Sequence, residues 1–128
     1  MPSVTVLAVD DQAVFRRAAR SLIAAAAGFE QVGEATSGAE ALELAAELHP
    51  DLVLVDVRMP GMDGIETARR LASTEPRSVV ILISVEEIPE LPAAVSEVGA
   101  AAHLRKQDLS VRSLRQLWDE HAPDRQSA

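Results

Sequence analysis

The sequence contains no cysteine, which excludes disulfide bonds, thiol chemistry and a cysteine-based zinc site. It has no apolar run of membrane-spanning length, and its first residues lead into a predicted strand without the basic segment of a signal peptide. Basic residues are also scarce, since 12 Lys and Arg face 20 Asp and Glu, for a formal net charge of -8. Such a charge repels phosphate backbones and anionic membranes. We therefore expect a cytoplasmic protein that binds neither nucleic acid nor membrane by itself, and that suits a multivalent cation or a basic or apolar partner.

What is present is an ordinary globular composition. The chain has 128 residues, of which 48% are hydrophobic and 25% are charged. This length supports one sizeable hydrophobic core and not two. We expect one domain over residues 1–121, followed by a polar, frayed tail at 122–128 that contains Pro123.

Apolar patterning predicts alternating strands and helices. Short β-branched and leucine-rich runs predict strands at 4–9, 31–35, 52–55, 79–83 and 101–104. Helical spacing predicts a helix from near Gln12 that stops at Gly28, a second that ends at Pro50, a third that closes near Pro76, and two more at about 91–98 and 110–121. Five such pairs predict an α/β fold with right-handed crossovers. It is a doubly wound, five-stranded parallel sheet of the flavodoxin-like (βα)5 kind, with strand order 2-1-3-4-5.

Carboxylates follow two of the predicted strands. Asp56 comes directly after the buried run at 52–55 and is followed by a Pro60-Gly61 turn. Asp10 and Asp11 end the first strand in the same way, where they also stand in position to cap the next helix. Ligands of open α/β sheets bind at the carboxyl ends of the strands, so we expect these three side chains to share one crevice.

Two further polar groups are predicted at the same edge, because Ser84 ends the fourth strand and Lys106 follows the fifth. Carboxylates packed closely stay ionised only beside a cation, and Mg2+ prefers oxygen ligands. An ammonium and a hydroxyl suit the oxygens of a phosphoryl group, and an aspartate can attack phosphorus to form an acyl phosphate. The edge therefore predicts magnesium-assisted chemistry on a phosphoryl group.

The arrangement resembles the receiver domain of bacterial two-component response regulators, the CheY-like family, over nearly the whole chain. The matching pieces are Val9-Asp10-Asp11, the stretch from Leu54 to Gly64, and the single residues Ser84 and Lys106, in that order. Singly these pieces mean little, but four of them at the expected strand ends make a specific pattern.

The resemblance implies a role for each site residue. Asp56 is the expected phosphoacceptor, with a phosphohistidine of a sensor kinase as donor. Asp11, Asp56 and the backbone carbonyl of Arg58 are the expected Mg2+ ligands, while Asp10 acts mainly through water. Self-catalysed phosphorylation and dephosphorylation at Asp56 are expected, without a further enzymatic activity.

The resemblance also implies a switch. Ser84 and Lys106 would bind phosphoryl oxygens, with Ser84 moving toward them. This motion would reach the face made by the helix at 91–98, the strand at 101–104 and the helix at 110–121, where such domains dimerise or meet an output domain.

The chain departs from the family pattern at several positions. Val85 stands where a small residue is usual, which predicts slower phosphoryl transfer or loss. His103 stands at the position of the aromatic switch residue, and both a gating role and an ordinary exposed strand histidine stay open. Gln107 replaces a frequent proline. The region from Gly99 to Asp108 is closest in pattern to LuxR/NarL-type receivers, whose output domains bind DNA, so a single-domain regulator and the first part of a longer one both stay open.

Arg58 and Glu86 are expected at the mouth of the pocket. They would either pair and screen the acyl phosphate from water or stand as two solvated charges. The small contribution of exposed pairs favours the second interpretation.

Three alternatives compete with a working receiver. A haloacid-dehalogenase-like phosphatase would carry a second carboxylate where this chain has Arg58, and a cap insertion that it lacks. A flavodoxin-like cofactor module would have to cradle phosphate beside Asp10 and Asp11. A vestigial receiver used as a phosphorylation-independent binding module gains little support from a complete set of site residues.

Overall fold

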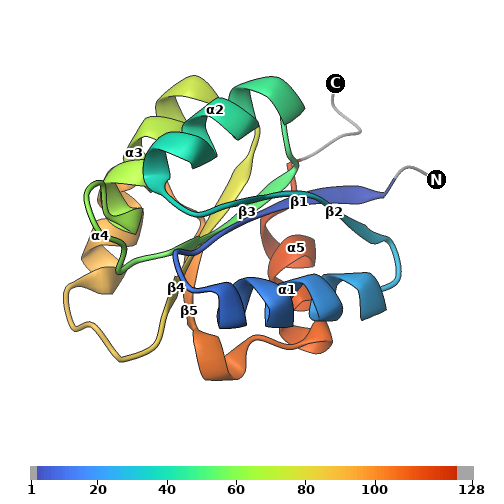
Figure 1. The fold of residues 1–128 in the computed structure, drawn as a ribbon. Coiled ribbons are helices and arrows are strands. Elements are labelled where there is room, and N and C mark those ends of the chain that lie inside the picture. The colour runs from blue at the N-terminus through green and yellow to red at the C-terminus, as the bar shows by residue number, and fades with distance from the viewer. Residues whose placement is uncertain (1–2, 124–128) are drawn as a thin grey trace.

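The computed structural model describes residues 3–123, in which strands and helices alternate (Figure 1). The elements are β1 (Val4–Val9), α1 (Ala13–Ala25), β2 (Phe29–Ala35), α2 (Gly38–Leu48), β3 (Leu52–Asp56), α3 (Gly64–Thr74), β4 (Val79–Ser84), α4 (Leu91–Val98), β5 (Ala102–Arg105), the short 3-10 helix η1 (Lys106–Asp108) and α5 (Val111–His121). The predicted tail at 122–128 falls outside the described residues from 124 onward.

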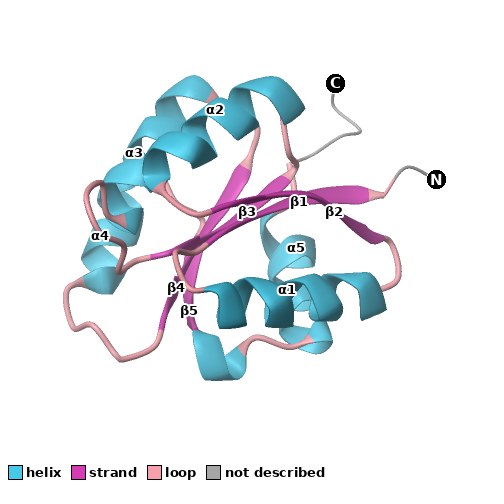
Figure 2. Ribbon diagram, in the orientation of Figure 1, coloured by secondary structure: helices cyan, strands magenta, loops and turns pink. Residues whose placement is uncertain are grey.

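The strands form one parallel sheet in the order β2-β1-β3-β4-β5. Helices α1 and α5 cover one face of the sheet and α2, α3 and α4 cover the other, so the domain has three layers (Figure 2). The predicted fold class and strand order are therefore confirmed. Over residues 3–123, every helix is too short or too polar to cross a bilayer.

Alternation along the strands divides the core in two. In β3, Val53 and Val55 face the α2, α3 and α4 layer, whereas Leu52 and Leu54 face α1 and α5. All four are at most 1% exposed. A strand buried on both faces reads as a continuous apolar run, which is why the stretch at 52–55 indicated a central strand. This strand holds Asp56 rigidly at its carboxyl end.

Three predicted boundaries are wrong by a few residues. Strand β2 begins at Phe29 and not at 31, because Phe29 pairs with Val4 of β1. Helix α1 ends at Ala25, since Ala26 takes an extended conformation, and Gly28 instead supplies a positive φ of 86° in the turn before β2. Strand β5 is shifted by one residue to Ala102–Arg105.

The predicted capping by the aspartates is also different in detail. Gln12 occupies the N-cap of α1 and its side chain makes no capping hydrogen bond. Asp10 Oδ1 instead accepts a hydrogen bond of 2.8 Å from the Gln12 backbone N–H. Asp10 thus fixes the start of the β1–α1 loop rather than the first turn of the helix.

Candidate functional site

The register of the sheet brings the predicted site residues to one edge. Val9 of β1 lies opposite Val55 of β3, so Asp10 reaches the same level as Asp56. Asp56 lies opposite Ile83 of β4, and Ser84 follows one residue further along. Ser84 in turn lies opposite Arg105 of β5, which directly precedes Lys106. Strand pairing alone therefore gathers all of these groups at the carboxyl ends of β1, β3, β4 and β5.

Three carboxylates form the centre of the site. Asp10, Asp11 and Asp56 each offer an oxygen, and these oxygens lie within 4.8 Å of one another. Asp10 is fully buried and Asp56 is 3% exposed, whereas Asp11 is exposed to solvent. Hard oxygen ligands at this spacing, open to solvent on one side, fit a divalent cation such as Mg2+ that retains some of its waters.

Lys106 reaches into the acidic cluster from the end of β5. Its Nζ lies 2.6 Å from Asp10 Oδ2 and 3.7 Å from Asp56 Oδ1, and its side chain is 12% exposed. One ammonium faces three carboxylates, so a net negative charge remains at the edge. This excess supports the fit to a cation.

The surroundings raise the pKa of Asp56 to about 6. Burial is the largest cause, and the nearby charge of Asp10 adds to it. Lys106 and a hydrogen bond from the Arg58 backbone N–H act in the opposite direction without offsetting the rise. Asp56 is thus a carboxylate that lacks enough positive charge around it, the electrostatic condition that a bound cation relieves.

The loop after β3 fixes Asp56 through its backbone. Gly61 supplies the positive φ of 75° in the Pro60-Gly61 turn, and the Gly64 N–H donates to the Val57 carbonyl over 2.9 Å. A methyl group at Gly64 would overlap the backbone carbonyl of Asp56, so only glycine permits this approach. Asp63 then caps α3 by accepting from the Glu66 N–H.

Ser84 lies at the site, and its hydroxyl is engaged within its own loop. Its side chain is buried, and Oγ donates a hydrogen bond of 2.8 Å to the backbone carbonyl of Glu86. The hydroxyl therefore has a partner within its own loop. Donating instead to a group on Asp56 would require the hydroxyl to give up this hydrogen bond.

Arg58 and Glu86 meet at the mouth of the pocket. Arg58 Nε lies 3.5 Å from Glu86 Oε1, while both side chains remain about two-thirds exposed, at 68% and 67%. The two side chains are thus paired and solvated at once, and a role in screening the acyl phosphate from water stays a prediction. Val85 is 61% exposed, so it lies largely in solvent, and its crowding of a phosphoryl group stays a prediction.

His103 is exposed on β5, at the rim of a cavity of about 330 Å³. Ser84 lines the same cavity, together with Ile88 from the loop before α4 and Leu91 at the start of α4. The predicted switch residues thus border one space, which is lined by the end of β4, the start of α4 and β5.

Sequence reasoning missed two residues that contact the site. Arg16 Nη1 donates to the backbone carbonyl of Asp10 over 2.7 Å, and the ring of Phe15 lies under Lys106, with Nζ 4.4 Å from its centroid. Both residues lie in the first turn of α1, shortly after Asp10 and Asp11. This closeness in sequence is the signal that could have indicated their contact with the site. By helical spacing alone, Phe15 would be placed only on the apolar face of the helix.

The protein is thus an α/β domain whose doubly wound parallel sheet carries three carboxylates and a lysine at its carboxyl edge, where such sheets bind ligands. The chain belongs to the response regulator receiver domain family, whose family model matches residues 6–118. It is therefore a receiver domain of two-component signal transduction, and a receiver domain is a phosphoacceptor. This match overturns the phosphatase and flavodoxin-like cofactor alternatives.

Curated relatives and solved structures agree. The chain is 36% identical over 118 residues to response regulator GacA of Pseudomonas aeruginosa, which covers 90% of the chain and 55% of GacA. It is 36% identical over 102 residues to the nitrate/nitrite response regulator NarL of Escherichia coli, covering 80% and 47% of the two chains. The receiver domain of a putative NarL from Mycobacterium tuberculosis has a TM-score of 0.85 at 34% identity, covering 94% and 100%.

The chain spans about half the length of these curated relatives. Another relative, a protein-glutamate methylesterase/protein-glutamine glutaminase of Myxococcus xanthus, is 43% identical over 105 residues, which are 80% of this chain and 30% of that protein. The similarity therefore covers only a receiver domain. The other activities that those names print are activities of the longer proteins.

Proposed function

We propose that Asp56 receives a phosphoryl group from a phosphohistidine of a sensor kinase or phosphotransfer protein. The observation that carries the proposal is the position of this carboxylate. It ends a fully buried strand, it is 3% exposed, and the ammonium of Lys106 lies 3.7 Å away. A rigid carboxylate beside a cation can meet phosphorus without reorganising the site.

In this reaction a carboxylate oxygen of Asp56 attacks phosphorus and forms an O–P bond. The P–N bond to the donor imidazole breaks, and its electron pair stays on the imidazole nitrogen. The product is an acyl phosphate at Asp56. Attack of water on phosphorus later regenerates the carboxylate and releases inorganic phosphate, so the domain catalyses its own phosphorylation and dephosphorylation and no other reaction.

We propose Mg2+ as the cation of the site, held by Asp11, Asp56 and the backbone carbonyl of Arg58. Asp10 suits a water-mediated role, because Oδ1 accepts from Gln12 and Oδ2 is paired with Lys106. When bound, the ion neutralises charge on the carboxylates and on the transferred group. Exposed Asp11 gives it access from solvent.

Lys106 and Ser84 would hold oxygens of the phosphoryl group. Lys106 lies beside Asp56 already, whereas Ser84 would give up its hydrogen bond to Glu86 and turn toward the new anion. That turn would alter the cavity that Ser84 shares with His103. The α4, β5 and α5 face would then change its packing, and we propose it as the surface for homodimerisation or output.

The proposed phosphohistidine donor also implies the cellular location of this receiver. A kinase that makes a phosphohistidine from ATP places this receiver, which we assign to residues 1–121, in the cytoplasm. If the chain is part of a longer LuxR/NarL-type regulator, the output is transcription regulation through a DNA-binding domain. The receiver by itself would not contact nucleic acid, given its net charge of -8.

The test is incubation with Mg2+ and acetyl phosphate, followed by intact-mass measurement. We expect one added phosphoryl group in wild type and in Asp119→Asn, a control that makes the same substitution on α5. We expect none in Asp56→Asn, and a strongly reduced amount when EDTA removes the metal. A wild-type protein that gains no phosphoryl group would favour the phosphorylation-independent binding module instead.

A further inference from the structure

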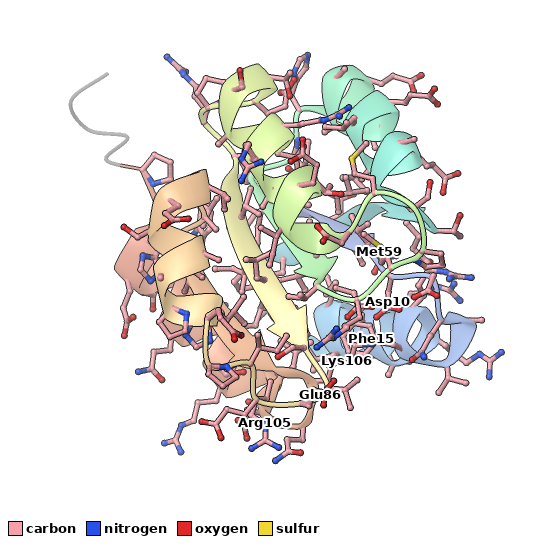
Figure 3. All side chains as sticks on the ribbon, turned by 90° about the vertical axis from the view of Figure 1, so that its left-hand side faces the viewer. Asp10, Phe15, Met59, Glu86, Arg105 and Lys106 are labelled. Carbon is pink, nitrogen blue, oxygen red and sulfur yellow. The ribbon has the colours of Figure 1, made fainter. Side chains whose placement is uncertain are left out.

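Lys106 has a contact on α1 besides its two carboxylates. Its Nζ lies 4.4 Å from the centroid of the Phe15 ring, on the first turn of that helix. Figure 3 labels Asp10, Phe15 and Lys106, which lie close together although they come from the β1–α1 loop, α1 and η1 respectively. The ammonium is therefore bounded by carboxylates and by an aromatic face.

The ring is itself held in place. Phe15 is partly buried and packs against the core cluster between the sheet and the helices α1 and α5. Leu104 and Leu109, on either side of Lys106 in sequence, pack against the same cluster. The ring and the backbone that carries Lys106 therefore share one rigid support, so the ring is a fixed surface against which the lysine rests.

The ring of Phe15 limits the positions that the Lys106 ammonium can occupy. A lysine ammonium has three N–H donors on a flexible stem, and its usual alternative to an ion pair is water. The negative face of an aromatic ring attracts the cation without offering a hydrogen-bond acceptor that competes with the carboxylates. This explains how a lysine at the edge of the sheet keeps a side chain only 12% exposed.

We propose that Phe15 is a positioning residue for phosphoryl transfer, whose ring holds the Lys106 ammonium between Asp10 and Asp56. The inference rests on the proposed function, because Lys106 matters to the reaction only if it contacts the transferred group. In this proposal the ring acts through its contact with the lysine ammonium and takes no direct part in the reaction.

The matched control is Phe29, the other phenylalanine of the chain. Arg115 lies over its ring at 5.1 Å from the centroid, and Phe29 is 8% exposed at the start of β2. A Phe29→Leu substitution therefore removes the same kind of contact and disturbs the core at least as much, at a position away from the acidic cluster.

The experiment measures the rate of labelling by acetyl phosphate with Mg2+. We expect Phe15→Leu to slow labelling about fivefold, the effect of losing a partly desolvated cation–π contact. Phe15→Tyr keeps the aromatic face and should restore most of the rate, and Phe29→Leu should match wild type. In a Lys106→Gln background, Phe15→Leu should have no further effect.

A second readout does not depend on the reaction. With 13C-labelled lysine, the ε-CH2 signal of Lys106, assigned from Lys106→Gln, should lose its ring-current shift in Phe15→Leu and keep it in Phe29→Leu. Suppose that wild type takes a phosphoryl group from acetyl phosphate but Phe15→Leu does so as fast as Phe29→Leu. That result would overturn this inference and leave the proposed function standing. Slowing that persists in the Lys106→Gln background would also overturn it. A wild type that takes no phosphoryl group would refute the proposed function, and the inference with it.

Discussion

Neutralising Asp56 should stabilise the metal-free protein. Burial and the charge of Asp10 raise the pKa of Asp56 from an ordinary value of 3.8 to about 6, so the folded state binds this proton more tightly than the unfolded state does. The favourable effect is complete below about pH 4 and is lost as the pH rises through about 6. At pH 7 the ionised carboxylate therefore costs stability.

The size of this cost follows from the shift. Each pKa unit corresponds to about 1.4 kcal/mol, so a shift of roughly two units sets an upper bound of about 3 kcal/mol. Asp56→Asn removes the charge at nearly constant shape. We expect a gain of about 1–3 kcal/mol in the free energy of unfolding at pH 7. The gain does not exceed the bound because Lys106 loses one of its two anionic partners in the variant, which offsets part of it.

Urea unfolding in EDTA from pH 4.5 to 7.5 measures this gain. The difference between Asp56→Asn and wild type should grow with pH, and saturating Mg2+ should reduce it by stabilising wild type more. Asp11→Asn is the matched control, since it removes the same charge from an exposed carboxylate of the same cluster and should stabilise less. A difference that is absent at pH 7, or that does not vary with pH, would refute the electrostatic account.

Three further predictions concern the site. Mg2+ affinity, measured by calorimetry, should fall about tenfold per pH unit below pH 6, because Asp56 becomes protonated there, and should be nearly constant above pH 7. A flat profile down to pH 5 would exclude Asp56 as a ligand. Gly64→Ala should cost about 1–3 kcal/mol in urea unfolding and slow phosphorylation, because the new methyl group pushes on the Asp56 backbone, and an unchanged variant would contradict that contact. Arg58→Ala and Glu86→Gln should each shorten the lifetime of the acyl phosphate by about two- to fivefold, the size expected for losing an exposed ion pair. Lifetimes equal to wild type would show that the pair does not screen the acyl phosphate from water.

Much of the fold was predictable because apolar periodicity and strand burial are strong signals. The run at 52–55 indicated β3, and its position made Asp56 an edge carboxylate. Boundaries failed where pairing between distant segments decides them. Phe29 joins β2 because Val4 lies opposite. Ala24 and Ala25 offer no signal for the end of α1, so the sequence indicates a stop only at the glycine three residues further on.

The site was predictable in its residues and not in its side-chain geometry. Chain order placed Lys106 beside the carboxylates, but only packing shows that it lies closer to Asp10 than to Asp56. The hydrogen bond of Ser84 to its own loop and the ring of Phe15 under the lysine likewise depend on rotamers that tertiary contacts select. Strand ends thus fix which groups meet, and packing fixes how they point.

The central claim is that one carboxylate of the acidic cluster, Asp56, accepts the phosphoryl group. The most direct measurement is to label the protein with acetyl phosphate and Mg2+, reduce the acyl phosphate with borohydride, which converts the modified aspartate to homoserine, and locate homoserine by peptide mass spectrometry. We expect homoserine at position 56 and unchanged aspartate at Asp10 and Asp11. Homoserine at another position, or at none in a labelled protein, would contradict it.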